Sequence, residues 1–186
     1  MAELTTQDVH AYTGGRLASS ADETTRLLNT ALNLARRYCG WHVTPVQTET
    51  VVMDGPGSTL LVLPTLQLES LTAIVEDGVT VDLDYVGHSP RGLLLKKPGY
   101  VGGGNGYRWS SAYSGISVTM THGFEEAPEW QSAVLSYVDR TSLAIGSVGQ
   151  RENVGPFSFS EKPAAAGSAF TDEERMLLDL YRLEAA

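Results

Sequence analysis

Apolar residues change their spacing twice along this chain, and this change constrains the fold more than any other feature. Residues 20–40 carry apolar side chains at the three- and four-residue spacing of a helix face. From Val46 to Val51 apolar and polar residues alternate instead, as in a strand with one buried side. Helical spacing returns after Pro128. The sequence therefore predicts helices that flank an inserted antiparallel β section at about 46–122, which is an α+β fold.

Local signals predict where the helices begin and which faces they bury. Ser20 and Glu23 make a capping box for the first long helix, and Gly40 ends it. Pro128 occupies the favoured first position of the next long helix. The expected buried stripe of that helix contains Trp130, Val134, Leu135, Val138 and Leu143.

Turn residues divide the inserted section into short strands. Asp77 and Gly78 suit the positive backbone angles of a tight hairpin turn. Residues 99–115 are rich in glycine and aromatic residues, which predicts a long mobile loop. Beyond 46–51, the expected strands are 60–63, 71–76, 79–82, 93–96 and 116–122.

The distribution of charge argues against tight binding of nucleic acid and raises the question of contacts between subunits. A formal net charge of -9 is unfavourable for tight nucleic-acid binding, but an acidic ring can let DNA pass without gripping it. No Lys or Arg lies between Arg37 and Arg91, whereas 91–124 contains cations and no carboxylate. These segments are either two solvated faces or complementary surfaces of neighbouring subunits. The candidate subunit or loop contacts are Lys96, Lys97, Arg108 and Trp109.

Motifs for catalysis or cofactor binding are not evident in the sequence. The glycine run at 102–106 lacks the Lys and Ser or Thr of a phosphate-binding loop. The four histidines show no metal-ligand spacing, and the single Cys39 is expected to pack in the core. We therefore expect no enzyme, no cofactor and no metal, with an enzyme or a small-molecule- or glycan-binding module as the remaining alternative class.

Membrane insertion and secretion are not expected either. The sequence contains no run of about 18 to 20 apolar residues of the kind a membrane helix needs. Its first residues lack the basic start and apolar run of a signal peptide. These features predict a soluble protein made in the cytoplasm of the producing cell.

The C-terminal region is expected to be an arm. Residues 148–160 suit an extended strand or arm, and the small residues of 163–169 suit a linker. Thr171 and Glu174 make a second capping box, for a helix that extends to about Glu184. We expect a domain at 1–162 and an arm at 163–186, which either docks on a partner or folds back on its own domain or a neighbouring subunit. The apolar stripe of the arm is Met176, Leu177, Leu180, Tyr181 and Leu183.

Several short segments, taken in order, carry a resemblance to a known family. They are RYCGWHV at 37–43, TVVMDGPG at 50–57, LVLPT at 61–65 and VTMTHGF at 118–124, followed by Pro128 and a helix. Over about residues 20–145 the chain resembles the head-to-tail adaptor, or connector, family of long-tailed phages, especially those that infect actinobacteria.

The resemblance implies a structural protein of the virion neck, made in the host cytoplasm. It implies a helical ring-forming core with a β insertion, assembled as a 12-subunit ring between the portal protein and the stopper or tail proteins. Genomic DNA would pass through the channel without specific binding, and the C-terminal arm would grip the portal. Another neck protein, a stopper or a tail terminator, is the alternative within the class, and the first partner bound distinguishes them.

Overall fold

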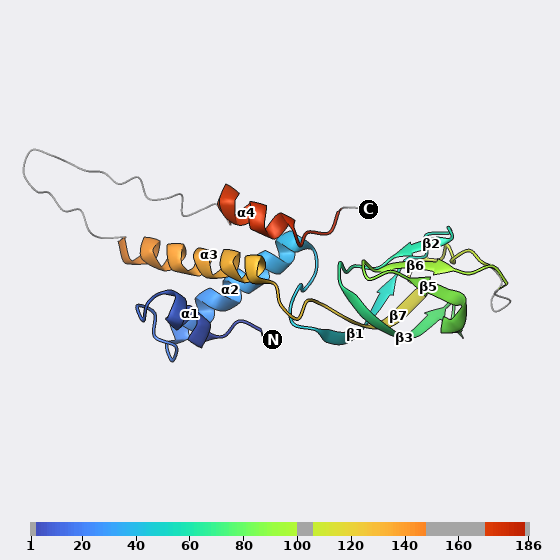
Figure 1. Ribbon diagram of the computed structural model, residues 1–186, viewed down its shortest axis with the longest axis horizontal. Coiled ribbons are helices and arrows are strands. Elements are labelled where there is room, and N and C mark those ends of the chain that lie inside the picture. The colour runs from blue at the N-terminus through green and yellow to red at the C-terminus, as the bar shows by residue number, and fades with distance from the viewer. Residues whose placement is uncertain (1–2, 100–105, 148–169, 185–186) are drawn as a thin grey trace, which may run out of the picture. The chain divides into compact units, whose positions relative to one another are not determined.

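The computed structural model describes residues 3–99, 106–147 and 170–184, with the side chains of 145–147 left out. The chain forms two compact units. The helical unit consists of Glu3–Cys39 and Ala127–Arg182, and the β unit consists of Gly40–Glu126 with Leu183 and Glu184. Helices and antiparallel sheets together make the α+β fold that the sequence predicts (Figure 1).

The helical unit contains four helices within the described residues: α1 (Thr6–Tyr12), α2 (Asp22–Cys39), α3 (Pro128–Ser147) and α4 (Asp172–Asp179). Helix α3 packs on α1, α2 and α4, and α2 also contacts α1 and α4. The buried face of α2 has the predicted helical spacing, with Leu27, Leu28, Ala31, Leu32, Ala35 and Cys39 all buried. Its predicted cap is wrong by one residue: α2 begins at Asp22, so Ala21 rather than Ser20 takes the cap position. Among the described helices, none is long and apolar enough to cross a membrane.

The buried stripe of α3 is only partly the predicted one. Trp130, Val134 and Val138 are fully buried, as expected from their four-residue spacing. Leu135 is half-buried and Leu143 is 52% exposed, so their assignment to the core is wrong. The other buried positions are the small side chains of Ala133 on α3 and of Ala127 just before it. A prediction based on the spacing of large apolar side chains does not identify small residues that pack at a helix contact.

The described residues of the β unit form two antiparallel sheets. The four-stranded sheet has the order β1-β7-β3-β4, and the three-stranded sheet has the order β2-β6-β5. Strands β6 and β7 have the predicted bounds, and Asp77 and Gly78 take positive φ angles of 49° and 81° in the predicted hairpin turn. The strands are β1 (Gln47–Met53), β2 (Leu60–Val62), β3 (Leu68–Glu76), β4 (Val79–Thr80), β5 (Val86–His88), β6 (Leu93–Lys96) and β7 (Ile116–His122).

One hydrophobic core lies within the β unit and contains residues of both sheets. Leu61 and Leu94 come from the three-stranded sheet, and Ile74, Val118 and Met120 come from the four-stranded one. Burial of both inner faces against each other explains why buried residues alternate with more exposed ones along β2, β6 and β7. The other members of this core are Leu63, Leu68, Val81, Val86, Trp109 and Ile116.

Candidate functional site

A buried ion pair holds the described part of the 99–115 segment against the β core. Lys96 Nζ lies 2.6 Å from Glu76 Oε2 and donates a second hydrogen bond, 2.9 Å long, to the carbonyl of Arg108. The same ammonium group lies 4.6 Å from the ring centroid of Trp109. Glu76 Oε1 accepts a hydrogen bond of 2.7 Å from the backbone N–H of Ser110. This pair therefore has partners on every side, as a buried charge requires.

Because this pair is buried, the basic segment at 91–124 is not simply a charged surface for a neighbouring subunit. Lys96 is 2% exposed and Trp109 is 1% exposed, so neither can present its side chain to a neighbouring subunit in this conformation. The acidic and basic segments meet within one chain at Lys96. Lys97 and Arg108 are exposed, although each also donates to a backbone carbonyl, of Asp84 and Gly57 respectively. A subunit contact remains a prediction for these two cations.

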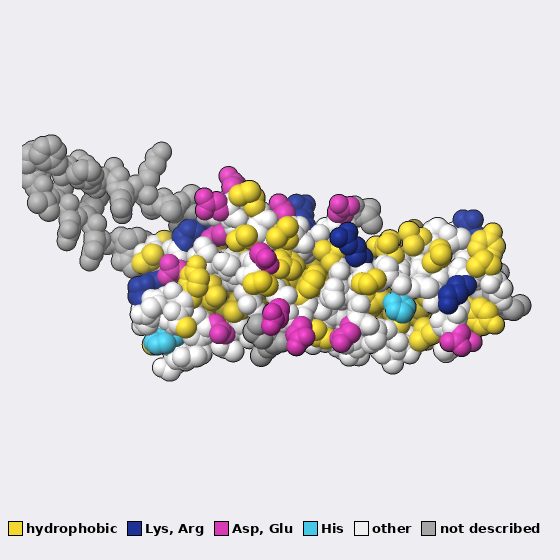
Figure 2. Space-filling model, in the orientation of Figure 1, with side chains coloured by type: hydrophobic (Ala, Val, Ile, Leu, Met, Phe, Trp, Pro, Cys, Tyr) yellow, Lys and Arg dark blue, Asp and Glu magenta, His cyan; other side chains and the backbone are white. Residues whose placement is uncertain are grey.

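The outer face of the three-stranded sheet is apolar and exposed. Strand register places Leu60 opposite Leu95 and Val62 opposite Leu93. All four side chains are exposed, whereas Leu61 and Leu94 between them point into the core. Figure 2 shows hydrophobic side chains gathered over β2 and β6. We call Leu60, Val62, Leu93 and Leu95 the apolar sheet face, and contiguous apolar surface of this kind marks interaction sites in soluble proteins.

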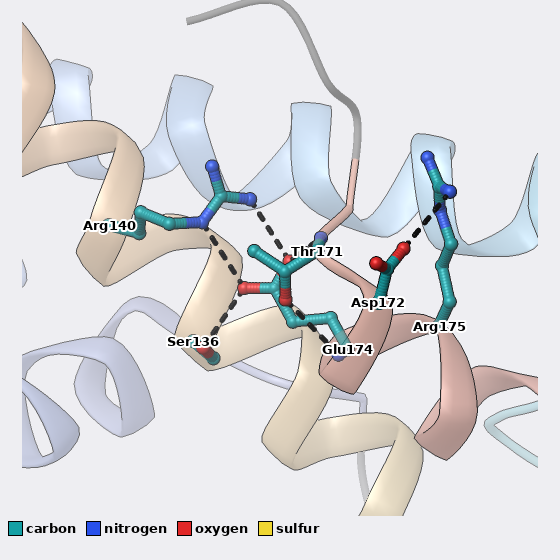
Figure 3. Close-up of polar contacts among 6 residues, drawn as sticks. All are labelled: Ser136, Arg140, Thr171, Asp172, Glu174 and Arg175. Atoms are coloured by element: carbon teal, nitrogen blue, oxygen red, sulfur yellow. Dashed lines mark hydrogen bonds and ion pairs between the residues drawn. The ribbon is translucent and has the colours of Figure 1, made fainter. Parts of the chain in front are cut away.

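Helix α4 is anchored to α3 by Glu174 (Figure 3). The carboxylate accepts hydrogen bonds from Arg140 Nη2 at 3.0 Å and from the Ser136 hydroxyl at 3.0 Å. Glu174 and Thr171 also complete the predicted capping box. Nearby, Leu178 and Phe170 are buried within the helical unit. This segment therefore packs on its own chain, which was one of the two alternatives for the C-terminal arm.

The apolar stripe predicted for the arm is divided between two sides of α4. Tyr181 is buried and its hydroxyl donates to Glu129 Oε2 of α3. Met176 and Leu180 are each 64% exposed, while Leu177 and Leu183 are intermediate. The helix ends at Asp179 rather than near Glu184, so Tyr181 and Leu183 lie beyond it. The residues at 148–160 and 163–169 lie outside the described part of the chain.

The charge of Glu174 makes the anchoring of α4 sensitive to pH. Burial raises the pKa of this carboxyl, but hydrogen bonds from Arg140, Thr171 and Ser136 lower it more, so the net pKa is below the usual value of 4.5. A carboxyl with a depressed folded-state pKa contributes stability above its unfolded pKa, and this stability is lost as the pH falls through the folded-state pKa.

We expect Glu174→Gln to lower the free energy of unfolding by about 1–3 kcal/mol at neutral pH, the cost of losing a charged hydrogen-bond partner. The variant should also lose less stability than the wild type on acidification below pH 4.5. Urea unfolding followed across a pH series measures both effects. Parallel pH profiles of the two proteins would contradict the anchoring role.

Two of the four histidines come together in the β unit with a carboxylate. His122 Nε2 lies 2.8 Å from Glu49 Oε1, and the rings of His42 and His122 meet edge to face with centroids 4.4 Å apart. His42 Nε2 and His122 Nδ1 are buried and have no hydrogen-bond partner in the part of the chain that the structure describes. Burial first, and the His122 ring second, lower the pKa of His42 below its usual value. We call these three residues the histidine cluster.

Sequence spacing could not reveal the histidine cluster. His42 lies in the segment after α2, Glu49 lies on β1, and His122 ends β7. Antiparallel pairing of β1 and β7 sets Gln47 opposite His122, which places Glu49 on the same face of the sheet as His122. The histidines show no metal-ligand spacing in the sequence, but the fold brings His42 and His122 together.

Comparison with known proteins finds a likeness in fold alone. No protein-family model matches the sequence, and no curated protein matches it. A solved chain from the neck of the native GTA (gene transfer agent) particle, computed with C12 symmetry, has a TM-score of 0.57 and 11% identity; the match covers 100% of this chain and 94% of that one. A chain from the neck of the empty GTA particle, computed with C6 symmetry, has a TM-score of 0.56 and 11% identity, with coverage of 98% and 91%.

Proposed function

We propose that this chain is a structural protein of the neck of a phage-like particle. The observation that supports it best is the fold likeness to neck chains along the whole length of both proteins. A match that covers both helical and β regions is more informative than a match to one sheet or one bundle, because common substructures recur in unrelated proteins. The neck chains come from reconstructions with C12 and C6 symmetry, which favours a ring.

Within the neck, the role that we propose is that of a head-to-tail adaptor. It forms a 12-subunit ring, binds the portal protein on one side and stopper or tail proteins on the other, and lets genomic DNA pass. The sequence resemblance to adaptors supports this assignment, and the net charge of -9 is consistent with a channel that does not grip DNA. The proposed role needs no catalysis and no cofactor.

The exposed apolar surfaces are the contacts that such a ring would use. In a cyclic assembly each subunit offers two different surfaces, so each contact joins unlike patches. The apolar sheet face, together with the exposed cations Lys97 and Arg108, is our candidate for contact with a neighbouring neck protein. Met176 on α4 and Leu180, which directly follows the helix, are our candidates for contact with the portal.

The proposal is tested by electron microscopy of the purified chain mixed with capsids that carry a portal. We expect an additional ring of density below the portal. Capsids without a portal are the control and should gain none. Binding to tail tubes and not to portal-bearing capsids would identify a stopper or tail terminator instead. A monomer whose thermal melt is stabilised by a small molecule or glycan would contradict a neck role.

A double substitution tests the portal contact on α4. We expect Met176→Ser with Leu180→Ser to weaken binding to portal-bearing capsids by about tenfold or more, since two apolar anchors at a contact contribute over 1 kcal/mol. The thermal melt should change little, because substitutions at exposed positions usually stay within about 0.5 kcal/mol. Binding is measured by co-sedimentation with the capsids.

The matched control is Glu173→Gln, an exposed change on the same helix that should leave both properties unaltered. Undiminished co-sedimentation of the double variant would remove α4 from the portal contact. Helix α4 would then have a structural role within the helical unit and no role in portal binding.

A further inference from the structure

We propose that His42, Glu49 and His122 bind a divalent transition-metal ion, zinc in the first instance. One ligand atom from each of the three side chains lies within 4.8 Å of the others. Two imidazoles and one carboxylate form a ligand set found in zinc sites that keep a fourth position for water. This site goes beyond the proposed neck function and does not depend on it.

Hydrogen bonding within the cluster leaves two of its nitrogens unexplained. Glu49 accounts for Nε2 of His122 only. Among the described residues, neither His122 Nδ1 nor His42 Nε2 has a well-formed hydrogen bond, although backbone groups of His122 and Pro45 interact with the His42 ring, and His122 as a whole is 1% exposed. Buried polar atoms in native proteins are almost always satisfied, so the unsatisfied nitrogen of His42, in a cluster with the His122–Glu49 pair, points to a missing partner. A metal ion can bind one nitrogen of each ring and so remove part of this deficit.

The backbone at Gly123 makes room for the His42 ring. Gly123 has a φ of 118°, and a Cβ atom built there would lie 2.7 Å from His42 Nε2 and 2.6 Å from the carbonyl oxygen of Pro45. A side chain at position 123 would therefore displace the imidazole from the cluster. The Trp41 ring stacks on the His122 ring, with centroids 6.2 Å apart, and meets the His42 ring edge to face, with centroids 5.3 Å apart. These ring contacts keep both imidazoles within the cluster.

Ion binding requires a small contraction of the cluster. Zinc-to-ligand distances of about 2.0–2.2 Å place ligand atoms about 3–3.5 Å apart in a tetrahedral site. Glu49 Oε1 and His122 Nε2 are already 2.8 Å apart, and all three ligand atoms lie within 4.8 Å of one another, so the remaining approach of about 1–2 Å is between His42 and the other two. His42 is only partly buried and can make this approach, and the exposed Glu49 side chain can follow it, while His122 is fully buried. The exposure of Glu49 also leaves the ion a route from solvent.

Binding should stabilise the β unit. The three ligands join the segment that enters this unit, its edge strand β1 and the end of its central strand β7. An ion that binds only the folded arrangement raises the melting temperature in proportion to the logarithm of its concentration. Zinc should therefore raise the melting temperature of the wild-type chain, and a chelator should reverse the rise.

The experiment uses the full chain, freed of metal with a chelator and then titrated with Co²⁺ as a visible-light probe for zinc. We expect one saturable equivalent with the intense absorption of four- or five-coordinate cobalt, displaced by Zn²⁺. His42→Gln and Glu49→Gln should each weaken binding about tenfold or more, since even outer-shell changes cost that much. His88→Gln is the matched control: His88 is an exposed histidine on β5 outside the cluster, and its loss should change nothing.

Glu49→Gln keeps the test independent of folding, because this exposed side chain can change without opening the core. Its melt without metal should match that of the wild type. Absence of a saturable cobalt signal overturns the proposal. A signal that survives both His42→Gln and Glu49→Gln also overturns it, because the ion would then bind elsewhere on the surface.

Discussion

Replacing Lys96 with methionine is expected to lower the free energy of unfolding by about 3–5 kcal/mol, the range for removing one partner of a buried ion pair. Methionine fills most of the space of the lysine stem, so the loss comes from Glu76 rather than from a cavity. Glu76 would keep the backbone N–H of Ser110 but lose the ammonium 2.6 Å away. An uncompensated carboxylate would then remain buried in the β core.

Urea unfolding of the full chain measures this effect, with Lys97→Met as the matched control. Lys97 is the next residue and is exposed, so its replacement should cost less than about 0.5 kcal/mol. Adding Glu76→Gln to Lys96→Met should recover part of the loss, because the second change removes the unpaired charge. Equal costs for Lys96→Met and Lys97→Met would show that the ion pair does not stabilise the β unit.

Truncation of Trp130 to alanine is expected to cost about 3–5 kcal/mol, the range for large aromatic side chains in cores. Trp130 is fully buried on α3, where it lies on the same helical stripe as Val134 and Val138. The change leaves a cavity of nearly the whole indole in the helical unit. The β unit has its own hydrophobic core, so its unfolding transition should be much less affected.

Leu143→Ala on the same helix is the control. Leu143 is 52% exposed, and alanine keeps the helix propensity high, so we expect a change within about 0.5 kcal/mol. Thermal melts followed by circular dichroism separate the two variants. A large loss for Leu143→Ala would mean that a partner or a neighbouring segment covers this residue.

Local patterns predicted those elements whose cause is local. Strands β6 and β7 were found at 93–96 and 116–122 because alternation along one strand reports directly on its buried face. The capping box of Thr171 and Glu174 also lies within one helical turn and was found as predicted. Strand β5 was missed because Val86 is the only large apolar residue in its three positions.

Features that depend on contacts far apart in the sequence could not be predicted. The sequence makes Lys96 a candidate subunit or loop contact, and only the position of Glu76 on β3 reveals its buried partner. The histidine cluster joins residues 73 positions apart, His122 and Glu49, through the pairing of β1 with β7. Which face of α4 is buried also depends on α3, since the helix carries apolar side chains on more than one side.

The β unit begins and ends at almost the same point. The N–H of Phe124 donates to the carbonyl of Val43 at 2.8 Å, so the segments that enter and leave the unit are joined by a hydrogen bond. An insertion with adjacent ends adds little loop-closure entropy to the protein that hosts it. The segment between α2 and α3 can therefore be exchanged, enlarged or removed during evolution. Such a change need not alter the packing of the helices on one another.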